Sequence, residues 1–133
     1  VTLVSREELL AQSDFISMHL LLNEDTRKSI NADFFKKMKN SAIFVNTARG
    51  GLVDEDALIE ALRTGEIAGA ALDVLTEEGI DKDAPLQKFD NVIITPHAAW
   101  YSEQAFYTLL TSAAQEVVRA LHGEPVKNQV NHF

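Results

Sequence analysis

The chain has 133 residues, of which 46% are hydrophobic and 24% charged, and it contains no cysteine. This length suffices for one domain with a buried core, and the missing cysteines exclude disulfide bridges and thiolate metal sites. A net charge of −8 argues against direct nucleic-acid binding and against an anionic membrane surface, and no apolar run has the length of a membrane span, so we expect a globular protein of the reducing cytoplasm.

Helix and strand patterns alternate along the first half of the chain. Ser5 is placed to cap a short helix, and residues 14–20 have the length and apolar character of a strand. A polar loop at residues 21–29 follows. Asn31 is then expected to cap a second helix, and residues 42–46 form a second strand that is apolar on both faces, as a central parallel strand should be.

The second half of the chain repeats this alternation. Asp54 is expected to cap a helix that Gly65 ends. Two further strands are predicted at residues 69–74 and 91–95, and a long acidic loop joins them. Ser102 is the predicted cap of a final long helix.

The alternation predicts an α/β fold with a parallel sheet and helical crossovers. The four strands would end near His19, Asn46, Asp73 and Thr95. Because parallel crossovers are right-handed, the loops after these residues should open to the same side of the sheet. Open α/β sheets bind their ligands at that edge.

Two residues at this edge are candidates for chemistry. Arg49 precedes Gly50 and Gly51, so its guanidinium group could hold a carboxylate bidentately where the backbone approaches a ligand closely; the alternative is an arginine that only ties down its own loop. His97 follows Pro96, and an ordinary histidine pKa of about 6.5 suits a proton donor near neutrality. Taken alone, a loop histidine is more often incidental than catalytic.

Acidic and aromatic residues surround these two candidates in the sequence. Glu77 and Glu78 could each pair with the histidine, or they could form a solvated surface. Asp73 ends a buried strand, where it would either cap backbone amides or accept a hydrogen bond from a ligand amide. Trp100 would form a pocket wall or simply pack. The four histidines are too dispersed to predict a metal site.

The order of four segments resembles the D-isomer-specific 2-hydroxyacid dehydrogenases. These segments are Gln12-Ser13-Asp14-Phe15-Ile16-Ser17-Met18-His19, Phe44-Val45-Asn46-Thr47-Ala48-Arg49-Gly50-Gly51-Leu52-Val53-Asp54, Ala70-Ala71-Leu72-Asp73-Val74 and Thr95-Pro96-His97. The resemblance covers nearly the whole chain. Residues 95–105 are most similar to the branch of the C-terminal-binding proteins and phosphoglycerate dehydrogenase-like enzymes.

The resemblance implies a role for each candidate. Arg49 would bind the carboxylate and carbonyl of a small 2-oxo acid, and His97 would act as general acid toward the carbonyl and as base in reverse. Glu78 would keep His97 protonated, Asp73 would hold the nicotinamide carboxamide, and Trp100 would face the substrate side chain. The implied cofactor is NAD and the implied assembly a homodimer. The residues implied to line the cofactor are His19, Leu20, Thr47, Ala48, Arg49, Asp73, His97 and Ala99.

The sequence departs from the family pattern at three points. Leu21 and Gly79 stand where many members carry proline, so both loops are expected to differ. The sequence also contains no G-x-G-x-x-G, the turn that binds pyrophosphate. We therefore expect residues 1–133 to be the C-terminal half of a Rossmann-type NAD-binding domain, without its glycine-rich half and without a substrate domain. Residues 14–19 should then form an exposed edge that pairs with another chain.

Two other functions stay open beside the dehydrogenase. One is a corepressor-like scaffold regulated by NAD(H), and the other is a catalytically incompetent fragment. Turnover by the full-length parent protein would indicate the dehydrogenase, whereas peptide binding would indicate the scaffold. The identity of the 2-hydroxy acid and the choice between NAD and NADP depend on residues outside this sequence.

Overall fold

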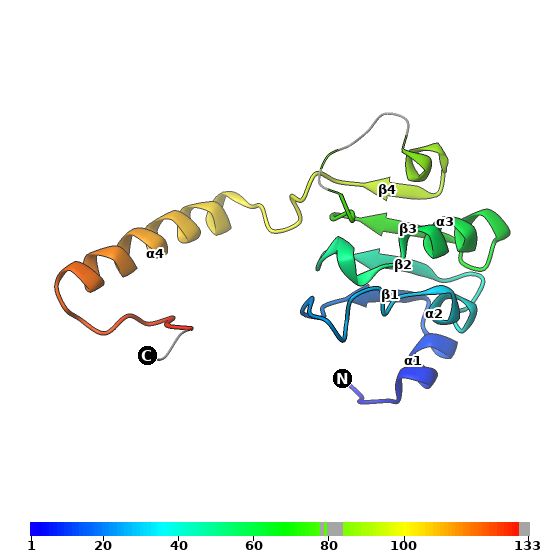
Figure 1. Ribbon diagram of the computed structural model, residues 1–133, viewed down its shortest axis with the longest axis horizontal. Coiled ribbons are helices and arrows are strands. Elements are labelled where there is room, and N and C mark those ends of the chain that lie inside the picture. The colour runs from blue at the N-terminus through cyan, green and yellow to red at the C-terminus, as the bar shows by residue number, and fades with distance from the viewer. Residues whose placement is uncertain (78, 80–83, 131–133) are drawn as a thin grey trace. The chain divides into compact units, whose positions relative to one another are not determined.

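The computed structural model describes residues 1–77, 79 and 84–130. The chain divides into two compact units, Val1–Ala99 and Trp100–Phe133. Within the described residues, the first unit contains the sheet and the helices α1 to α3, and the second contains the helix α4 (Figure 1).

The first unit is built on a parallel sheet of four strands in the order β1-β2-β3-β4 (Figure 1). Its strands are β1 (Phe15–Met18), β2 (Ile43–Asn46), β3 (Gly69–Leu72) and β4 (Val92–Ile94). The register aligns the last residues of all four strands in one row, which reads Met18, Asn46, Leu72 and Ile94. The predicted α/β class and the common edge are therefore confirmed, and every following loop starts from the same edge of the sheet.

Three α-helices accompany this sheet: α1 (Arg6–Gln12), α2 (Ala32–Lys36) and α3 (Glu55–Thr64). Ser5 and Asn31 cap the first two as predicted, since their side-chain oxygens accept hydrogen bonds from backbone amides three residues later. The prediction that Asp54 caps α3 is wrong in its chemistry: Asp54 occupies the cap position, but its side chain makes no capping hydrogen bond. Its carboxylate lies 3.6 Å from the Lys28 ammonium instead.

Aromatic side chains form the centre of the core between α2 and the sheet. Phe34, Phe35 and Phe44 meet edge to face, with ring centroids 5.4 to 6.1 Å apart. Phe35 and Phe44 are fully buried. Each such side chain contributes roughly 1.5–3 kcal/mol through burial, and each edge-to-face pair adds about 0.5–1.5 kcal/mol. This cluster fixes β2, and with it the loop that carries Arg49.

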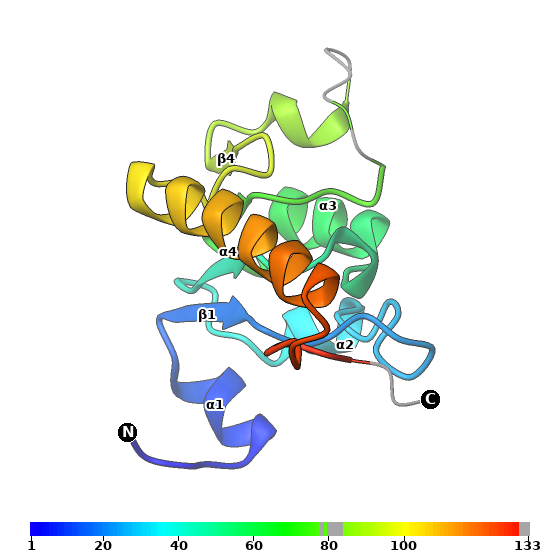
Figure 2. The ribbon, with the colours of Figure 1, turned by 90° about the vertical axis from the view of Figure 1, so that its left-hand side faces the viewer.

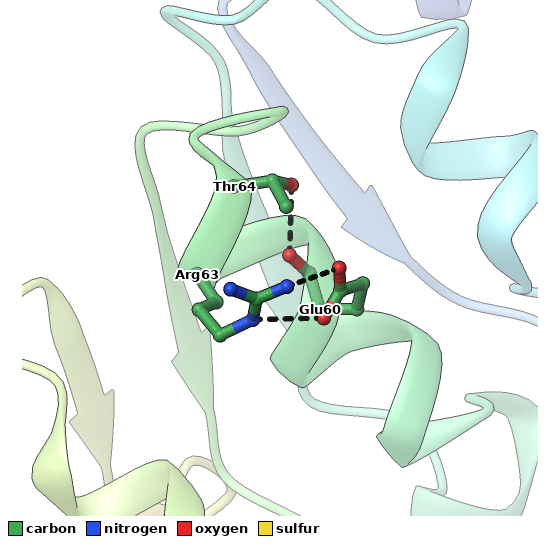
Figure 3. A network of polar contacts seen from close by, with 3 residues as sticks. All are labelled: Glu60, Arg63 and Thr64. Atoms are coloured by element: carbon green, nitrogen blue, oxygen red, sulfur yellow. Dashed lines mark hydrogen bonds and ion pairs between the residues drawn. The ribbon is translucent and has the colours of Figure 1, made fainter.

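The last turn of α3 is closed by local polar contacts. Nε and Nη2 of Arg63 donate to the two carboxylate oxygens of Glu60 at 2.9 and 2.6 Å, and the Thr64 hydroxyl donates to the Glu60 carbonyl oxygen at 2.8 Å (Figure 3). Gly65 then takes a left-handed backbone with φ 71°, which ends the helix as predicted. These contacts are exposed and belong to α3 alone, so Arg63 and Thr64 offer control positions for experiments on the site.

The connection from β3 to β4 differs from the loop expected there. Residues Pro85–Lys88 form a 3₁₀ turn, and Leu86 within it is buried in the core. A lone apolar residue among polar ones gives little periodic signal, although proline at the first turn is a usual helix start. The third predicted strand also ends two residues early, because Asp73 turns its side chain to the loop after β4.

Strand β1 lies at one end of the strand order, and within the described residues only β2 pairs with it. Ile16 and Met18 are buried, whereas the Phe15 side chain on the alternate face is 69% exposed. The predicted edge strand is thus confirmed.

The second unit consists of α4 (Glu103–Leu121) and the segment after it, and Figure 2 shows α4 as one uninterrupted helix. Ser102 caps it as predicted, since its hydroxyl oxygen accepts from the Ala105 amide at 3.0 Å. The Lys127 amide donates to the Glu116 carboxylate at 2.8 Å, which ties the segment after α4 back to the helix. No helix in the described ranges has the length and hydrophobicity that crossing a membrane requires.

Candidate functional site

A cavity of about 580 Å³ lies in the first unit, lined by residues of the loops that follow the strands. Three of the predicted site residues line it: Arg49 from the loop after β2, Asp73 from the end of β3, and His97 from the loop after β4. They are 24 or more positions apart in the sequence, and the shared edge of the sheet brings them together. The remaining wall is largely apolar and includes Leu22 and Ile94.

Asn46 shapes the loop that presents Arg49. Its side chain is almost completely buried, with 1% exposure. Its Nδ2 donates to the Arg49 carbonyl oxygen at 3.0 Å, and its Oδ1 accepts from the Ala48 amide at 3.0 Å. An amide side chain can make both kinds of bond, which a carboxylate or a hydroxyl at this depth could not do as well. Asn46 therefore satisfies backbone groups of the loop that carries Arg49.

The Arg49 side chain is exposed at the rim of the cavity. Among the described residues, its guanidinium group makes one hydrogen bond, from Nη1 to the Ala48 carbonyl oxygen at 2.6 Å. A guanidinium group has five N–H donors, so most of its donor capacity remains available to an anion.

Two glycines allow the Arg49 loop to pack closely against its neighbours. A Cβ atom on Gly50 would lie 1.9 Å from the carbonyl oxygen of Leu75, so only glycine fits against the segment after β3. A Cβ atom on Gly51 would lie 3.0 Å from the Leu22 side chain. The backbone conformation is ordinary at both positions. Close approach to backbone therefore requires glycine at position 50, whereas at position 51 the end of the Leu22 side chain would have to shift by only a few tenths of an ångström.

The loop between β1 and α2 is bonded to the same region. The Lys28 amide donates to the Gly51 carbonyl oxygen at 2.9 Å, and the Ile30 amide donates to that of Leu52 at 3.0 Å. The Asp54 amide returns a bond to Ile30 at 2.9 Å. The Arg49 loop is therefore held between two other loops, which limits the positions that the arginine can take.

His97 has an unusual backbone conformation. Its φ is 52°, in the left-handed region that side chains other than glycine rarely adopt. Its amide donates to the carbonyl oxygens of Asp73 at 2.9 Å and Thr95 at 3.0 Å. Strained residues of this kind concentrate at functional sites, where the surrounding structure holds them. The imidazole is exposed beside the cavity rather than packed in the core.

Asp73 is buried, with 5% exposure, and its carboxylate accepts three hydrogen bonds. Burial alone would raise the pKa of Asp73. The hydrogen bonds from the Thr95 hydroxyl and from the Ala99 and Ala98 amides, together with the nearby His97 charge, outweigh burial and hold the pKa below its ordinary value. Asp73 is therefore a carboxylate anion near neutral pH. It accepts hydrogen bonds from backbone amides, which is one of the two roles predicted for it.

The other predicted residues lie at several places. His19, Leu20, Thr47, Ala48 and Ala99 follow strands at the same edge but do not line the cavity. His19 Nε2 lies 3.0 Å from the Ser17 hydroxyl. Trp100 begins the second unit, where its ring contacts Tyr101 edge to face. Glu77 lines the cavity, whereas Glu78, the predicted partner of His97, lies outside the described residues.

Sequence reasoning missed two residues of the site. Leu22 lines the cavity from the loop after β1, and Thr95 lines it while donating its hydroxyl proton to Asp73 at 2.5 Å. The sequence marks Thr95 as the end of a strand beside Pro96, but it does not indicate the contact of its hydroxyl with Asp73. In the described ranges, no three His, Asp or Glu side chains gather as they would around a metal ion.

Comparison with known proteins gives a consistent result. Residues 1–99 match the D-isomer specific 2-hydroxyacid dehydrogenase, NAD binding domain. The chain is 43% identical over 125 residues to glyoxylate/hydroxypyruvate reductase B of Cronobacter sakazakii, an alignment that covers 94% of this chain and 39% of that protein.

Solved structures share the fold. The D-lactate dehydrogenase of Lactobacillus jensenii with NAD⁺ superposes with a TM-score of 0.89 at 34% identity, covering 97% of this chain and 43% of that one. A D-isomer specific 2-hydroxyacid dehydrogenase of Xanthobacter autotrophicus Py2 in complex with NADPH and MES gives 0.79 at 40% identity, covering 95% and 51%. The chain thus spans about half or less of each of these proteins. It belongs to the D-isomer specific 2-hydroxyacid dehydrogenase family, and its residues 1–99 correspond to the NAD-binding domain of that family.

Proposed function

We propose that this chain forms the part of an NAD(H)-dependent 2-hydroxyacid dehydrogenase that binds the nicotinamide end of the cofactor and supplies the acid–base residue. The observation that carries the proposal is the shared cavity. An arginine whose donors are mostly unused among the described residues and a histidine in a strained backbone conformation line one cavity from the loops after β2 and β4, with an ionised aspartate that directly follows β3. An anion site beside a proton donor is what reduction of a 2-oxo acid needs.

In this proposal Arg49 binds the substrate and His97 transfers the proton. The Arg49 guanidinium binds the substrate carboxylate through two parallel hydrogen bonds and so orients the adjacent carbonyl group. His97 donates a proton to the carbonyl oxygen as the carbonyl carbon is reduced, and it removes that proton from the hydroxyl group in the reverse direction. Glu78 pairs with the imidazole in this proposal and favours its protonated form.

The cavity wall suits a nicotinamide ring. The ring is flat and largely apolar and carries one amide group, and the wall offers apolar side chains with a single buried carboxylate, Asp73. Among the described residues, Asp73 Oδ2 accepts one hydrogen bond, from Ala99, and a carboxylate oxygen can accept two, so it can also receive a carboxamide N–H. When bound, NADH supplies the hydride for the carbonyl carbon. We propose that the rest of the cofactor contacts residues beside this cavity, namely His19, Leu20, Thr47, Ala48 and Ala99.

The proposal extends to the parts beyond the cavity. Residues 1–133 act as the second half of an NAD-binding domain, so a glycine-rich half and a substrate domain complete the enzyme, which acts as a homodimer. The sequence lacks G-x-G-x-x-G, and the chain covers 39% of the reductase to which it is 43% identical. Trp100 faces the substrate side chain in the complete enzyme.

A graft tests the proposal. The 125 aligned residues of this chain replace the matching segment of the Cronobacter sakazakii reductase, and NADH oxidation is measured with glyoxylate, hydroxypyruvate and pyruvate. We expect turnover of at least one of these acids. Arg49→Gln should raise KM and lower kcat/KM by at least about a hundredfold, the loss expected when two charge-assisted hydrogen bonds disappear.

The matched control for Arg49 is Arg63→Gln, which removes an exposed arginine paired with Glu60 on α3 and should leave turnover unchanged. A folded graft that binds NADH tightly without reducing any 2-oxo acid would overturn the enzymatic proposal and favour the scaffold function. A folded graft without NADH affinity would identify an incompetent fragment.

A further inference from the structure

Among the described residues, the loop after β4 donates several hydrogen bonds to Asp73. The Thr95 hydroxyl and the Ala98 amide donate to Asp73 Oδ1 at 2.5 and 2.8 Å, and the Ala99 amide donates to Oδ2 at 3.0 Å. The His97 amide donates to the carbonyl oxygen of the same aspartate at 2.9 Å. Four donors from five consecutive residues thus converge on Asp73, which directly follows β3.

These bonds enclose the strained residue on both sides. His97 has φ 52°, and the bonds come from Thr95 before it and from Ala98 and Ala99 after it. A left-handed conformation at a residue with a side chain persists only where several contacts determine it together. Asp73 is 5% exposed and ionised, so its hydrogen bonds are charge-assisted and shielded from water.

We propose that Thr95 and Asp73 are positioning residues that together hold the backbone of His97 in its left-handed conformation and thereby direct the imidazole toward the cavity. We call this pair, with the amides of Ala98 and Ala99, the Asp73 clasp. Thr95 acts through Asp73: its hydroxyl fixes the plane of the carboxylate so that Oδ1 faces the Ala98 amide and Oδ2 the Ala99 amide. What His97 then does rests on the proposed function, but the geometry of the clasp does not.

The clasp also links two parts of the cavity. Within the described residues Oδ2 accepts only the Ala99 bond, which leaves room for a second donor, and Asp73 lines the cavity. A ligand amide that bonds Oδ2 therefore engages the same carboxylate that fixes His97. Binding of a ligand amide at Oδ2 and the position of the His97 imidazole are therefore coupled directly through the Asp73 side chain.

Solution NMR on the full 133-residue chain tests the clasp without any enzymatic readout. The coupling between the amide and α protons of His97, read together with the intraresidue amide–α NOE that distinguishes positive from negative φ, reports φ, and hydrogen exchange of the Ala98 and Ala99 amides reports their bonds to Asp73. The variants are Thr95→Val, which removes the hydroxyl at nearly constant volume, and Thr95→Ser, which restores it. Thr64→Val is the control, because Thr64 makes its hydroxyl bond within α3 (Figure 3).

In the unmodified chain, the coupling should correspond to a positive φ at His97, and both amides should exchange slowly. Thr95→Val should speed exchange of both amides roughly tenfold or more, as loss of a bond to a charged group implies, and should shift the His97 coupling toward ordinary backbone values. Thr95→Ser should restore both readouts, and Thr64→Val should leave both unchanged.

Two results would overturn the inference. One is a negative φ at His97 in the unmodified chain, a result that requires no variant to fold. The other is a Thr95→Val chain that is folded and keeps both the coupling and the slow exchange. Failure of the dehydrogenase proposal would show instead as lost turnover in the graft with these NMR readouts intact, so the two claims can be separated.

Discussion

Gly50→Ala tests how tightly the Arg49 loop packs against the segment after β3. A Cβ atom on Gly50 would lie 1.9 Å from the carbonyl oxygen of Leu75 and 2.5 Å from the amide nitrogen of Thr76. Real Cβ contacts essentially never fall below 3.0 Å, so the two segments must separate by about 1 Å. The obstructing atoms belong to the backbone, so no change of rotamer relieves the clash.

The expected cost follows from this geometry. Overfilling a packed interior costs about 1–3 kcal/mol, and a clash with rigid backbone belongs at the upper end, near 3 kcal/mol. Gly65→Ala is the matched control, because Gly65 has φ 71° but no atom within 4 Å of its Cβ position. Its cost is conformational only, about 1 kcal/mol once the smaller entropy of the unfolded chain is counted.

Urea denaturation followed by circular dichroism gives the free energy of unfolding of both variants. Gly50→Ala should lose about 2 kcal/mol more than Gly65→Ala, and in the graft it should also raise KM for the 2-oxo acid because Arg49 moves with its loop. Equal losses for the two variants would show that the loops are not in close contact. Contact with the segment after β3 would then not be what positions Arg49.

Three further predictions concern the same unit. Asn46→Ala should cost about 1–3 kcal/mol in urea denaturation, because it leaves the Arg49 carbonyl and the Ala48 amide without their buried partner; a loss below about 0.5 kcal/mol would mean that water replaces both bonds. The lowered pKa of Asp73 should contribute stability in full above the ordinary aspartate pKa of about 3.9, and this contribution should disappear as the pH falls through the lower folded value. Urea midpoints measured across acidic pH should show that slope, and Asp73→Asn should reduce it; an unchanged slope would mean that other carboxylates cause it. Phe15→Lys should weaken self-association in sedimentation while changing stability by less than about 0.5 kcal/mol, whereas Leu3→Lys, on an even more exposed side chain outside β1, should have no effect; a monomeric unmodified chain would contradict the edge-pairing prediction.

Local signals in the sequence predicted the elements well. Ser5, Asn31 and Ser102 cap helices as expected, and Gly65 ends α3, because capping depends on residues within one turn. The apolar runs at β1 to β4 marked the strands, and their alternation with helical segments specified a parallel sheet. The meeting of Arg49, Asp73 and His97 followed from topology alone, since parallel strands bring their carboxyl ends to one edge.

The contacts that shape the site could not be predicted in the same way. Thr95 and Asp73 are 22 positions apart, and no local pattern reveals that a hydroxyl and a carboxylate meet there. The left-handed backbone at His97 has no glycine to mark it, and the close approach of Gly50 to Leu75 depends on how two loops pack. At Asp54 the local signal was misleading. The residue type suits a helix cap, but its side chain makes no capping hydrogen bond and instead lies near the Lys28 ammonium.

The central claim is that His97 is the acid–base residue of a 2-oxo acid reductase, and kcat of the graft carrying His97→Asn tests it most directly. The variant keeps a planar, polar side chain but cannot donate a proton as an imidazolium does, so kcat should fall by about a hundred- to ten-thousandfold, with NADH binding retained. His122→Asn, at the end of α4, is the control and should keep full activity. A folded His97→Asn graft that reduces the 2-oxo acid as fast as the unmodified graft would contradict the account.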